Sequence, residues 1–346
     1  MFHNNDGDVP WQQYNDGSGD GRDDYELART QSFGFFDDIP SKEWRELQMI
    51  HLDSFPNYYS RGNPNPMMQY SSKSLGSKGD IPQLRMSSWW NGENFQTEFH
   101  CRTMRRVPST SQADGPKWVC DPNRLKKKKK GKDVGDVASS AGEEGNKQQK
   151  PCLVYSFGSN GKTEFEQGIQ EATDDSCEIH TFDMATYNKR NGSFKEALAK
   201  IGVPFHPWGL GTEAQSQQNP ETFKTLKESM IELGHVGRTI DIFKIDCEWC
   251  EWSTYKQFLG IDNGDGIVVD IRQILVETHN APMPEAKNFF FDLHDAGFVI
   301  FSKEANYQNG AGGVEFGFVK LRTDFFIEGS TYNNITTKYP HTPLLG

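Results

Sequence analysis

The segment from Cys152 to Asp183 constrains the fold more strongly than any other part of the chain. It begins with a short apolar run of strand length, 152–157, that stops at the turn Gly158–Gly161. A helical pattern follows over about 163–172, and a second strand, 179–182, ends in an acid. A Rossmann-like sheet builds a nucleoside site from this order of elements. The segment therefore predicts a parallel α/β sheet with a ligand at the glycine turn.

The turn also indicates which nucleoside to expect. It reads Gly-x-x-Gly, so it lacks the Gly-x-Gly-x-x-Gly fingerprint of dinucleotide sites, and Gly161-Lys162-Thr163 lacks the earlier glycine of a P-loop. S-adenosylmethionine has no pyrophosphate, so a looser turn with an acid for its ribose suits it. An ordinary βαβ unit with a tight turn remains the alternative. We expect S-adenosylmethionine as cofactor, bound by Phe157, Gly158, Ser159, Gly161, Asp183, Met184 and Asp246.

Strands and helices continue to alternate as far as residue 321. The patterns predict helices near 193–200, 221–233, 252–259 and 284–296, and strands at 203–206, 240–245, 273–276, 298–302 and 314–321. The last two strands are joined by 306–310, which is too short for a crossover helix, so they should be antiparallel. We predict a class I methyltransferase fold. It has a seven-stranded, mostly parallel sheet with an antiparallel last strand and helices on both faces.

Composition limits how much of the chain can fold around this sheet. The mean hydropathy of −0.74 is too polar for 346 residues that are globular throughout. We expect an acidic, largely disordered region at 1–90 with a possible short helix near 41–52, and a methyltransferase domain at 95–325. A lysine-rich disordered insert is expected at 124–150 and a C-terminal tail at 326–346.

Partners other than the cofactor are less closely specified. The net charge of −11 argues against nucleic acid as the main partner. Five consecutive lysines at 126–130 could form a nuclear localisation signal or a polyanion-binding segment, although a solvated loop is favoured in so acidic a chain. No apolar run approaches the ~20 residues of a membrane helix, and no signal peptide is visible. The compartment and the acceptor, whether small molecule, glycan or protein, stay open.

Six cysteines raise the question of disulfides and metals. Cys101 and Cys120 could pair. Cys247 and Cys250 lie between a strand and a helix N-terminus, a setting that lowers a thiol pKa. A zinc site needs four ligands, and neither a second close cysteine pair nor a His-x-His set is visible. We therefore expect no metal, with buried or incidental thiols as the default.

Three motifs carry a resemblance to a known family. They are the strand and turn at 152–159, the segment Asp-Gly-Pro-Lys-Trp-Val-Cys-Asp-Pro at 114–122, and the string Lys-Ile-Asp-x-Glu-x-x-Glu-Trp within 243–252. Together they resemble the methyltransferase domain of methyltransferase-like twenty-four proteins, relatives of the FkbM-type enzymes, over about 95–325. The resemblance implies S-adenosylmethionine binding and methyl transfer, with oxygen acceptors in the FkbM branch. Trp249 departs from the pattern, because the family usually has Gly there.

Acidic residues gather where the predicted strands end. Parallel sheets bind ligands at that edge, and Asp183, Asp246, Glu248 and Glu277 all fall there. Asp246 and Glu248 are one residue apart after a strand, so we expect both to point the same way and one pKa to be raised. His279 follows on the same rim and is a candidate general base. The catalytic candidates are thus Asp246, Glu248 and His279.

Each candidate has a simpler alternative. A carboxylate just past a strand commonly caps the next helix; this is the favoured role of Glu251 and an alternative for Asp246. His279 could be a surface histidine without a role. A methyltransferase-like binding module without activity also remains open, because a fold does not establish a reaction. We expect an S-adenosylmethionine-dependent methyltransferase with an unidentified acceptor.

Overall fold

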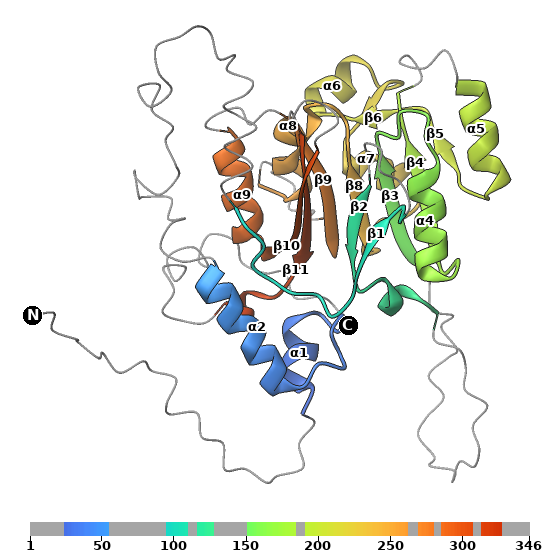
Figure 1. Ribbon diagram of the computed structural model, residues 1–346. Helices are drawn as coiled ribbons and strands as arrows, with labels where there is room; N and C mark the ends of the chain where they lie inside the picture. Colours follow the sequence, from blue (N-terminus) through green and yellow to red (C-terminus); the bar gives the residue numbers. More distant parts are fainter. Residues whose placement is uncertain are drawn as a thin grey trace, which may run out of the picture.

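The computed structural model describes residues 24–54, 95–109, 116–127, 151–184, 191–261, 269–279, 285–306 and 313–326. Its centre is a seven-stranded sheet in the order β10-β11-β9-β8-β3-β4-β5 (Figure 1). These strands are β3 (Cys152–Phe157), β4 (Cys177–Phe182), β5 (Phe205–His206), β8 (Ile242–Ile245), β9 (Gln273–His279), β10 (Phe298–Asn306) and β11 (Gly313–Lys320).

The pairing of the strands confirms the predicted fold class. Strands β3, β4, β5, β8 and β9 run parallel, whereas β11 is antiparallel to both β9 and β10. The chain moves outward from β3 to β5 in one direction and then from β8 to β9 in the other. The strand order therefore reverses beside β3, which is where open α/β sheets place their ligands.

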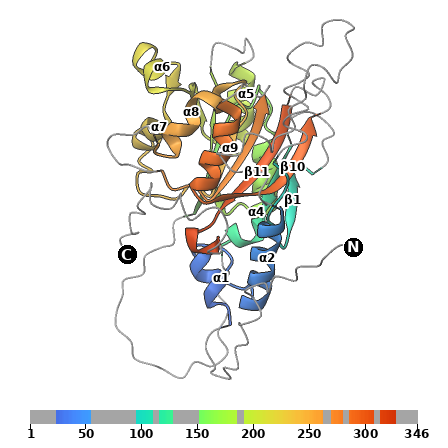
Figure 2. The same ribbon diagram turned by 90° about the vertical axis from the view of Figure 1, so that its left-hand side faces the viewer.

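Helices cover both faces of the sheet, as Figure 2 shows from the side. One face carries α7 (Leu226–Glu232), α8 (Cys250–Phe258) and α9 (Glu285–Asp295); the other carries α4 (Glu164–Thr173) and α5 (Asn191–Lys200). Strands β3 and β8 are buried on both faces, which explains why they read as nearly continuous apolar runs.

One predicted helix begins later than expected. In place of a helix over 221–233, the structure has α6 (Glu213–Gln218), a short β7 (Phe223–Lys224) and then α7. Thr225 is the reason: its hydroxyl accepts from the Glu228 N–H, and the Glu228 carboxylate accepts from the Thr225 N–H. This capping box fixes the start of α7. The residues before it pair instead with β6 (Gly209–Leu210).

A small antiparallel pair lies against the main sheet. It consists of β1 (Met104–Val107) and β2 (Lys117–Cys120), followed by the 3-10 turn η3 (Pro122–Leu125). The Gln273 side chain on β9 fixes β2 in place, because it accepts from the Cys120 N–H at 3.0 Å and donates to the Cys120 carbonyl at 2.9 Å. As a consequence, Lys117 at the start of β2 is carried toward the strand ends.

The N-terminal helices lie at the end of the molecule opposite α6 (Figure 1). These are α1 (Glu26–Gln31), which the sequence did not predict, and α2 (Ser41–Ser54), which lies where a short helix near 41–52 was expected. Trp44 is fully buried there, and its indole N–H donates to Gln31 at 2.7 Å. Phe35 lies under the Arg272 guanidinium at the amino end of β9. Both helices therefore pack far from the strand ends where a ligand is expected.

Several predictions about chain organisation lie outside the described residues. They concern most of the acidic region at 1–90, the lysine-rich insert beyond residue 127, and all but the first residue of the tail at 326–346. The two 3-10 turns next to these segments, η3 and η4 (Thr323–Phe325), are described, and each ends in a buried side chain.

Candidate functional site

A cavity of about 640 Å³ lies at the carboxyl edge of the sheet. Its size is within the range of small-molecule sites. Its walls come from the turn after β3, the ends of β4, β8 and β9, and the β6 segment. The residues that line it include Pro108, Pro116, Gly158, Ser159, Asn160, Lys162, Phe165, Phe182, Asp183, Met184, Leu210, Lys244, Asp246, Cys247, Glu248, Trp249 and Glu277.

The glycine turn is shaped by its contact with the end of β8. Gly158 has a φ of +76°, and a Cβ atom there would overlap the backbone carbonyl of Asp246. The Gly158 N–H donates to the Phe182 carbonyl at 2.9 Å, and the Asp246 N–H donates to the Phe157 carbonyl at 3.1 Å. The turn therefore joins β4 to β8 through backbone contacts, and only glycine fits.

Asp183 lies at the tip of β4, as predicted, and holds the same turn. Its Oδ2 atom accepts from the Ser159 N–H at 3.0 Å and from the Asn160 N–H at 2.8 Å. Asp183 and Met184 both line the cavity. Of the other residues predicted to bind the cofactor, Phe157 is fully buried and Gly161 completes the turn with a φ of +74°.

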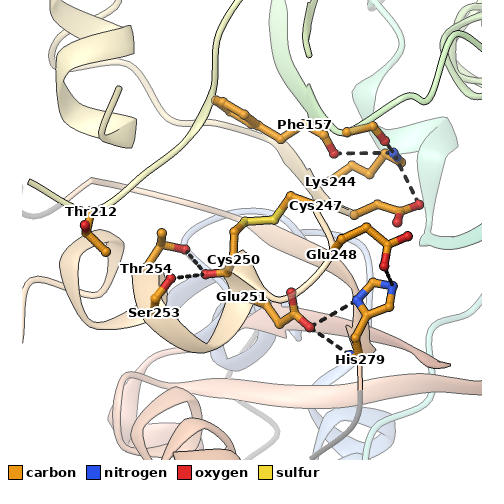
Figure 3. Close-up of a disulfide and its surroundings, with 12 residues drawn as sticks. Phe157, Thr212, Lys244, Cys247, Glu248, Cys250, Glu251, Ser253, Thr254 and His279 are labelled. Atoms are coloured by element: carbon orange, nitrogen blue, oxygen red, sulfur yellow. Dashed lines mark hydrogen bonds and ion pairs between the residues drawn. A yellow bond between two sulfur atoms is a disulfide. The ribbon is translucent and has the colours of Figure 1, made fainter. Parts of the chain in front are cut away.

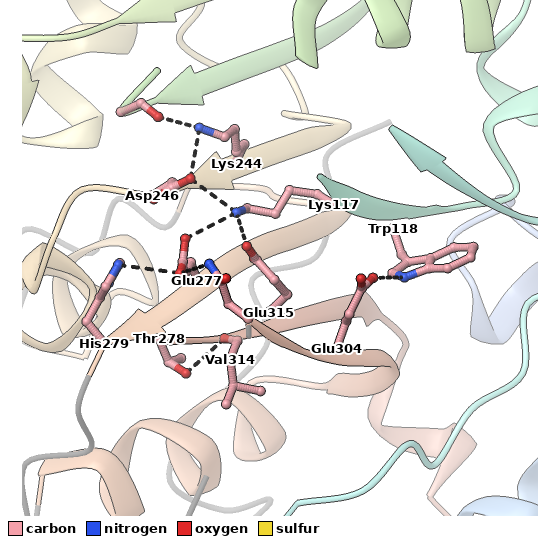
Figure 4. A network of polar contacts seen from close by, with 12 residues as sticks. Lys117, Trp118, Lys244, Asp246, Glu277, Thr278, His279, Glu304, Val314 and Glu315 are labelled. Atoms are coloured by element: carbon pink, nitrogen blue, oxygen red, sulfur yellow. Dashed lines mark hydrogen bonds and ion pairs between the residues drawn. The ribbon is translucent and has the colours of Figure 1, made fainter. Parts of the chain in front are cut away.

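A buried lysine lies at the centre of the charged groups (Figure 4). The Lys117 side chain is only 1% exposed. Its ammonium donates to Glu315 at 2.6 Å and to Asp246 at 3.1 Å, and lies 3.7 Å from Glu277. Asp246, Glu277 and His279 have the ligand types of a cation site, but the Lys117 ammonium already supplies a positive charge among these carboxylates.

A second lysine ties the turn to the end of β8. The Lys244 ammonium donates to the carbonyls of Gly158 and Phe157 and lies 3.6 Å from Asp246 (Figures 3 and 4). Asp246 therefore lies between two ammonium groups. Burial alone would raise its pKa, but Lys117, Lys244 and His279 hold the pKa of Asp246 below its ordinary value.

The structure corrects the expectation that Asp246 and Glu248 point the same way into one site. Glu248 has a φ of +52°, and its side chain is 75% exposed, so it does not share a buried site with Asp246. The carboxyl groups whose pKa is raised are those of Glu277 and Glu315. Burial raises the pKa of Glu277, which lines the cavity, and burial together with the nearby Glu277 and Asp246 raises the pKa of Glu315 to about 8.

His279 is held by a buried acid (Figure 3). Glu251, fully buried in the first turn of α8, accepts from the backbone N–H of His279 at 2.7 Å and lies 3.1 Å from its ring Nδ1 atom. Burial would lower the pKa of His279, but Glu251, Glu277 and Glu248 raise it to about 9. The imidazole is thus protonated near neutral pH, which argues against a resting general base. Glu251 binds β9 in place of the predicted helix cap.

The loop between β8 and α8 is closed by a disulfide between Cys247 and Cys250 (Figure 3). Within it, Trp249 has a φ of +82°, is 47% exposed and lines the cavity. This backbone conformation is one that glycine adopts without strain. Trp249 therefore holds a backbone conformation that residues with a side chain rarely adopt, and its indole adds an aromatic wall to the cavity.

All six cysteines are paired, which corrects the expectation of free thiols. Cys101 joins Cys120 on β2, and Cys152 joins Cys177 at the start of the neighbouring strands β3 and β4. The first bond anchors the strand that carries Lys117. The second lies at the amino edge of the sheet, away from the cavity.

Sequence reasoning missed Lys117, Lys244 and Glu315 as site residues. Each is a charged residue in a largely apolar strand, and each is buried. Such residues almost always have a partner, because an unpaired buried charge is very costly. A charged residue within a largely apolar strand could therefore have been identified from the sequence as a candidate site residue, although its partners could not.

Comparison with known proteins decides the family. A family described as "Methyltransferase domain" matches residues 26–320. The chain belongs to this methyltransferase family. The match begins upstream of the predicted limit at residue 95, so it includes α1 and α2. A search of curated proteins gave no match.

Several solved structures are similar at low identity. Methanococcus jannaschii fibrillarin, a pre-rRNA processing protein, is 10% identical with a TM-score of 0.33, over 50% of this chain and 68% of that one. Aeropyrum pernix fibrillarin, solved with natively bound S-adenosylmethionine, is 12% identical with a TM-score of 0.31, over 49% and 66%. An O-methyltransferase family protein from Burkholderia thailandensis is 11% identical with a TM-score of 0.29, over 50% and 52%.

The family match makes the chain a methyltransferase and supports S-adenosylmethionine as its cofactor. The sheet order with its antiparallel last strand agrees with the class I methyltransferase fold. None of the described helices combines the length and the apolar character that spanning a bilayer requires.

Replacement of Gly158 should test the contact between the turn and β8. Gly158→Ala is expected to lower the free energy of unfolding by about 2–4 kcal/mol, because the new Cβ meets backbone that cannot move aside. Urea unfolding measures the change. At the exposed Gly192, near the start of α5, no atom lies within 4 Å of an added Cβ. Gly192→Ala should therefore be neutral or stabilise by up to about 1 kcal/mol. Equal effects of the two changes would contradict the assigned contact.

The His279–Glu251 pair predicts how stability depends on pH. A raised histidine pKa contributes stability below about pH 6.5, the ordinary histidine value, and this contribution is lost as pH rises through about 9. His279→Gln should therefore lower the melting temperature more at pH 6 than at pH 9.5. The exposed His100 provides the control, since His100→Gln should change the melting temperature by the same amount at the two pH values. An equal shift for His279→Gln would rule out the ion pair.

Proposed function

We propose that this methyltransferase moves the methyl group of S-adenosylmethionine to an oxygen nucleophile of its acceptor. The methyl carbon leaves the sulfonium sulfur as it bonds to the acceptor oxygen. The acceptor's proton passes to the Glu277 carboxylate, and S-adenosylhomocysteine and a methylated product remain. The observation that supports this proposal most strongly is a cavity at the carboxyl edge of the sheet with Glu277 in its wall.

The position of the cavity supports the cofactor assignment. The glycine turn, Asp183 and Met184 form the part of the wall nearest β3 and β4, beside the reversal in strand order. Both hydrogen bonds of Asp183 within the described residues go to its Oδ2 atom. We assign Oδ1 to the ribose hydroxyls. Ser159 and Gly158 bring backbone close to the cofactor, and Phe157 and Gly161 hold that turn.

The chemistry of Glu277 favours an oxygen acceptor. A hydroxyl is a weak nucleophile until its proton leaves, so its methylation benefits from a nearby base. The raised pKa of Glu277 brings it closer to the value such a base needs. The Asn306 amide donates to the Glu277 Oε1 atom at 2.9 Å and orients it. Asp246 keeps Lys117 in place, and the exposed Glu248 at the rim positions the acceptor.

An acceptor screen tests the reaction. The protein is incubated with S-adenosylmethionine labelled on its methyl group and with panels of hydroxyl-bearing small molecules, glycans and proteins. The proposal expects label in an oxygen-linked product and one S-adenosylhomocysteine per transfer. Binding of S-adenosylmethionine by calorimetry without label transfer across all panels would favour a binding module instead.

Glu277→Gln should then lower kcat by about 10²-fold or more, in the range of a lost general base, with little change in cofactor affinity. Glu315→Gln is the matched control, because Glu315 contacts the same Lys117 but does not line the cavity. It should lose stability and keep most of its turnover. If Glu277→Gln turns over like the wild type, the base is elsewhere.

Asp183→Ala should weaken S-adenosylmethionine binding by about 1–3 kcal/mol, because it removes a charged hydrogen-bond acceptor from the site. Calorimetric titration measures this effect. Glu196→Ala on the exposed face of α5 should bind like the wild type. Unchanged affinity for Asp183→Ala would remove the ribose assignment.

A further inference from the structure

A second cluster of titratable side chains lies on the face of the sheet covered by α7. Glu178 and His180 project from β4, and His235 comes from the segment that follows α7. One ligand atom from each of the three lies within 4.8 Å of the others. The two imidazoles are 8% and 7% exposed and the Glu178 side chain is 34% exposed, so an ion could enter beside the carboxylate.

The distances in this cluster match those between zinc ligands. The Glu178 Oε1 atom lies 3.1 Å from His180 Nε2 and 3.2 Å from His235 Nε2. With zinc–ligand bonds of about 2.0–2.1 Å, two ligand atoms at a tetrahedral angle lie about 3.3 Å apart. Both imidazole Nε2 atoms thus lie beside the same carboxylate oxygen.

The surrounding hydrogen bonds fix the orientation of each ligand. A histidine that binds metal through Nε2 carries its proton on Nδ1 and donates it to a second group. His235 Nδ1 lies 2.7 Å from the Tyr155 hydroxyl, and His180 Nδ1 lies 2.9 Å from His206 Nε2. The other oxygen of Glu178 accepts from the Arg238 guanidinium at 2.6 Å, so an ion would bind Oε1 and replace its hydrogen bonds to the two imidazoles.

We propose that Glu178, His180 and His235 bind one zinc ion, with water in the fourth position. This proposal departs from the expectation of no metal, which considered only cysteine pairs and His-x-His patterns. The ion would connect β4 to the segment after α7. His206 stacks on His180 at 5.1 Å and on Phe182 at 4.7 Å, and Phe182 lines the cavity. The site thus supports the cavity wall through His206 and Phe182. Zinc binding can be measured without an assay of methyl transfer.

Zinc binding to the chelator-treated protein tests the proposal. Calorimetric titration with zinc chloride should give one ion per chain, and Glu178→Gln and His235→Gln should each lower the affinity by more than about 100-fold. The control is His294→Gln, in the separate buried cluster of His51, Glu98 and His294, which should bind zinc like the wild type. Loss of zinc only in His294→Gln, or iron(II) binding without zinc binding, would overturn the proposal.

Long-range proton–nitrogen NMR on the wild-type protein avoids any folding defect in the variants. Zinc should move the imidazole proton of both His180 and His235 to Nδ1, whereas without metal each ring can donate from Nε2 to Glu178. Uptake of zinc with no change at these two rings would show an adventitious ion elsewhere and would contradict the site.

Discussion

The ion pairs of Lys117 are the interaction on which the carboxyl edge of the sheet depends. This ammonium is almost completely buried and is surrounded by Asp246, Glu277 and Glu315, which come from the three adjacent strands β8, β9 and β11. Three carboxylates this close would repel one another if all were ionised. Burial raises the pKa of Glu277 and Glu315 despite the nearby lysine, whereas at Asp246 the effect of burial is outweighed by Lys117 and Lys244, so its pKa falls.

The rest of the structure positions this lysine and the cavity beside it. The Gln273 amide and the Cys101–Cys120 disulfide hold β2 against the sheet, and Gly158 lets the turn after β3 touch the end of β8. Helices α1 and α2 pack at the opposite end, so the two ends of the sheet have separate roles. One end supplies apolar packing, and the other concentrates charged groups around a cavity.

The sequence predicted what short-range patterns determine. The order of strands, the glycine turn and Asp183 follow from local periodicity and turn chemistry, and the structure has all three. It could not predict contacts between distant strands: Lys117 and Glu315 are 198 positions apart. The cap expected for Glu251 was wrong for the same reason, since a partner 28 positions away outcompetes the local backbone.

A double-mutant cycle tests most directly whether the buried ammonium holds this edge together. The free energy of unfolding is measured for Lys117→Met, for Glu315→Gln and for both changes together. Each single change should destabilise the protein, Lys117→Met by about 3–5 kcal/mol because it leaves buried carboxylates unpaired. The double variant should be more stable than the sum predicts by about 1 kcal/mol or more. Strictly additive effects would contradict the account, because they would mean that the two groups do not interact.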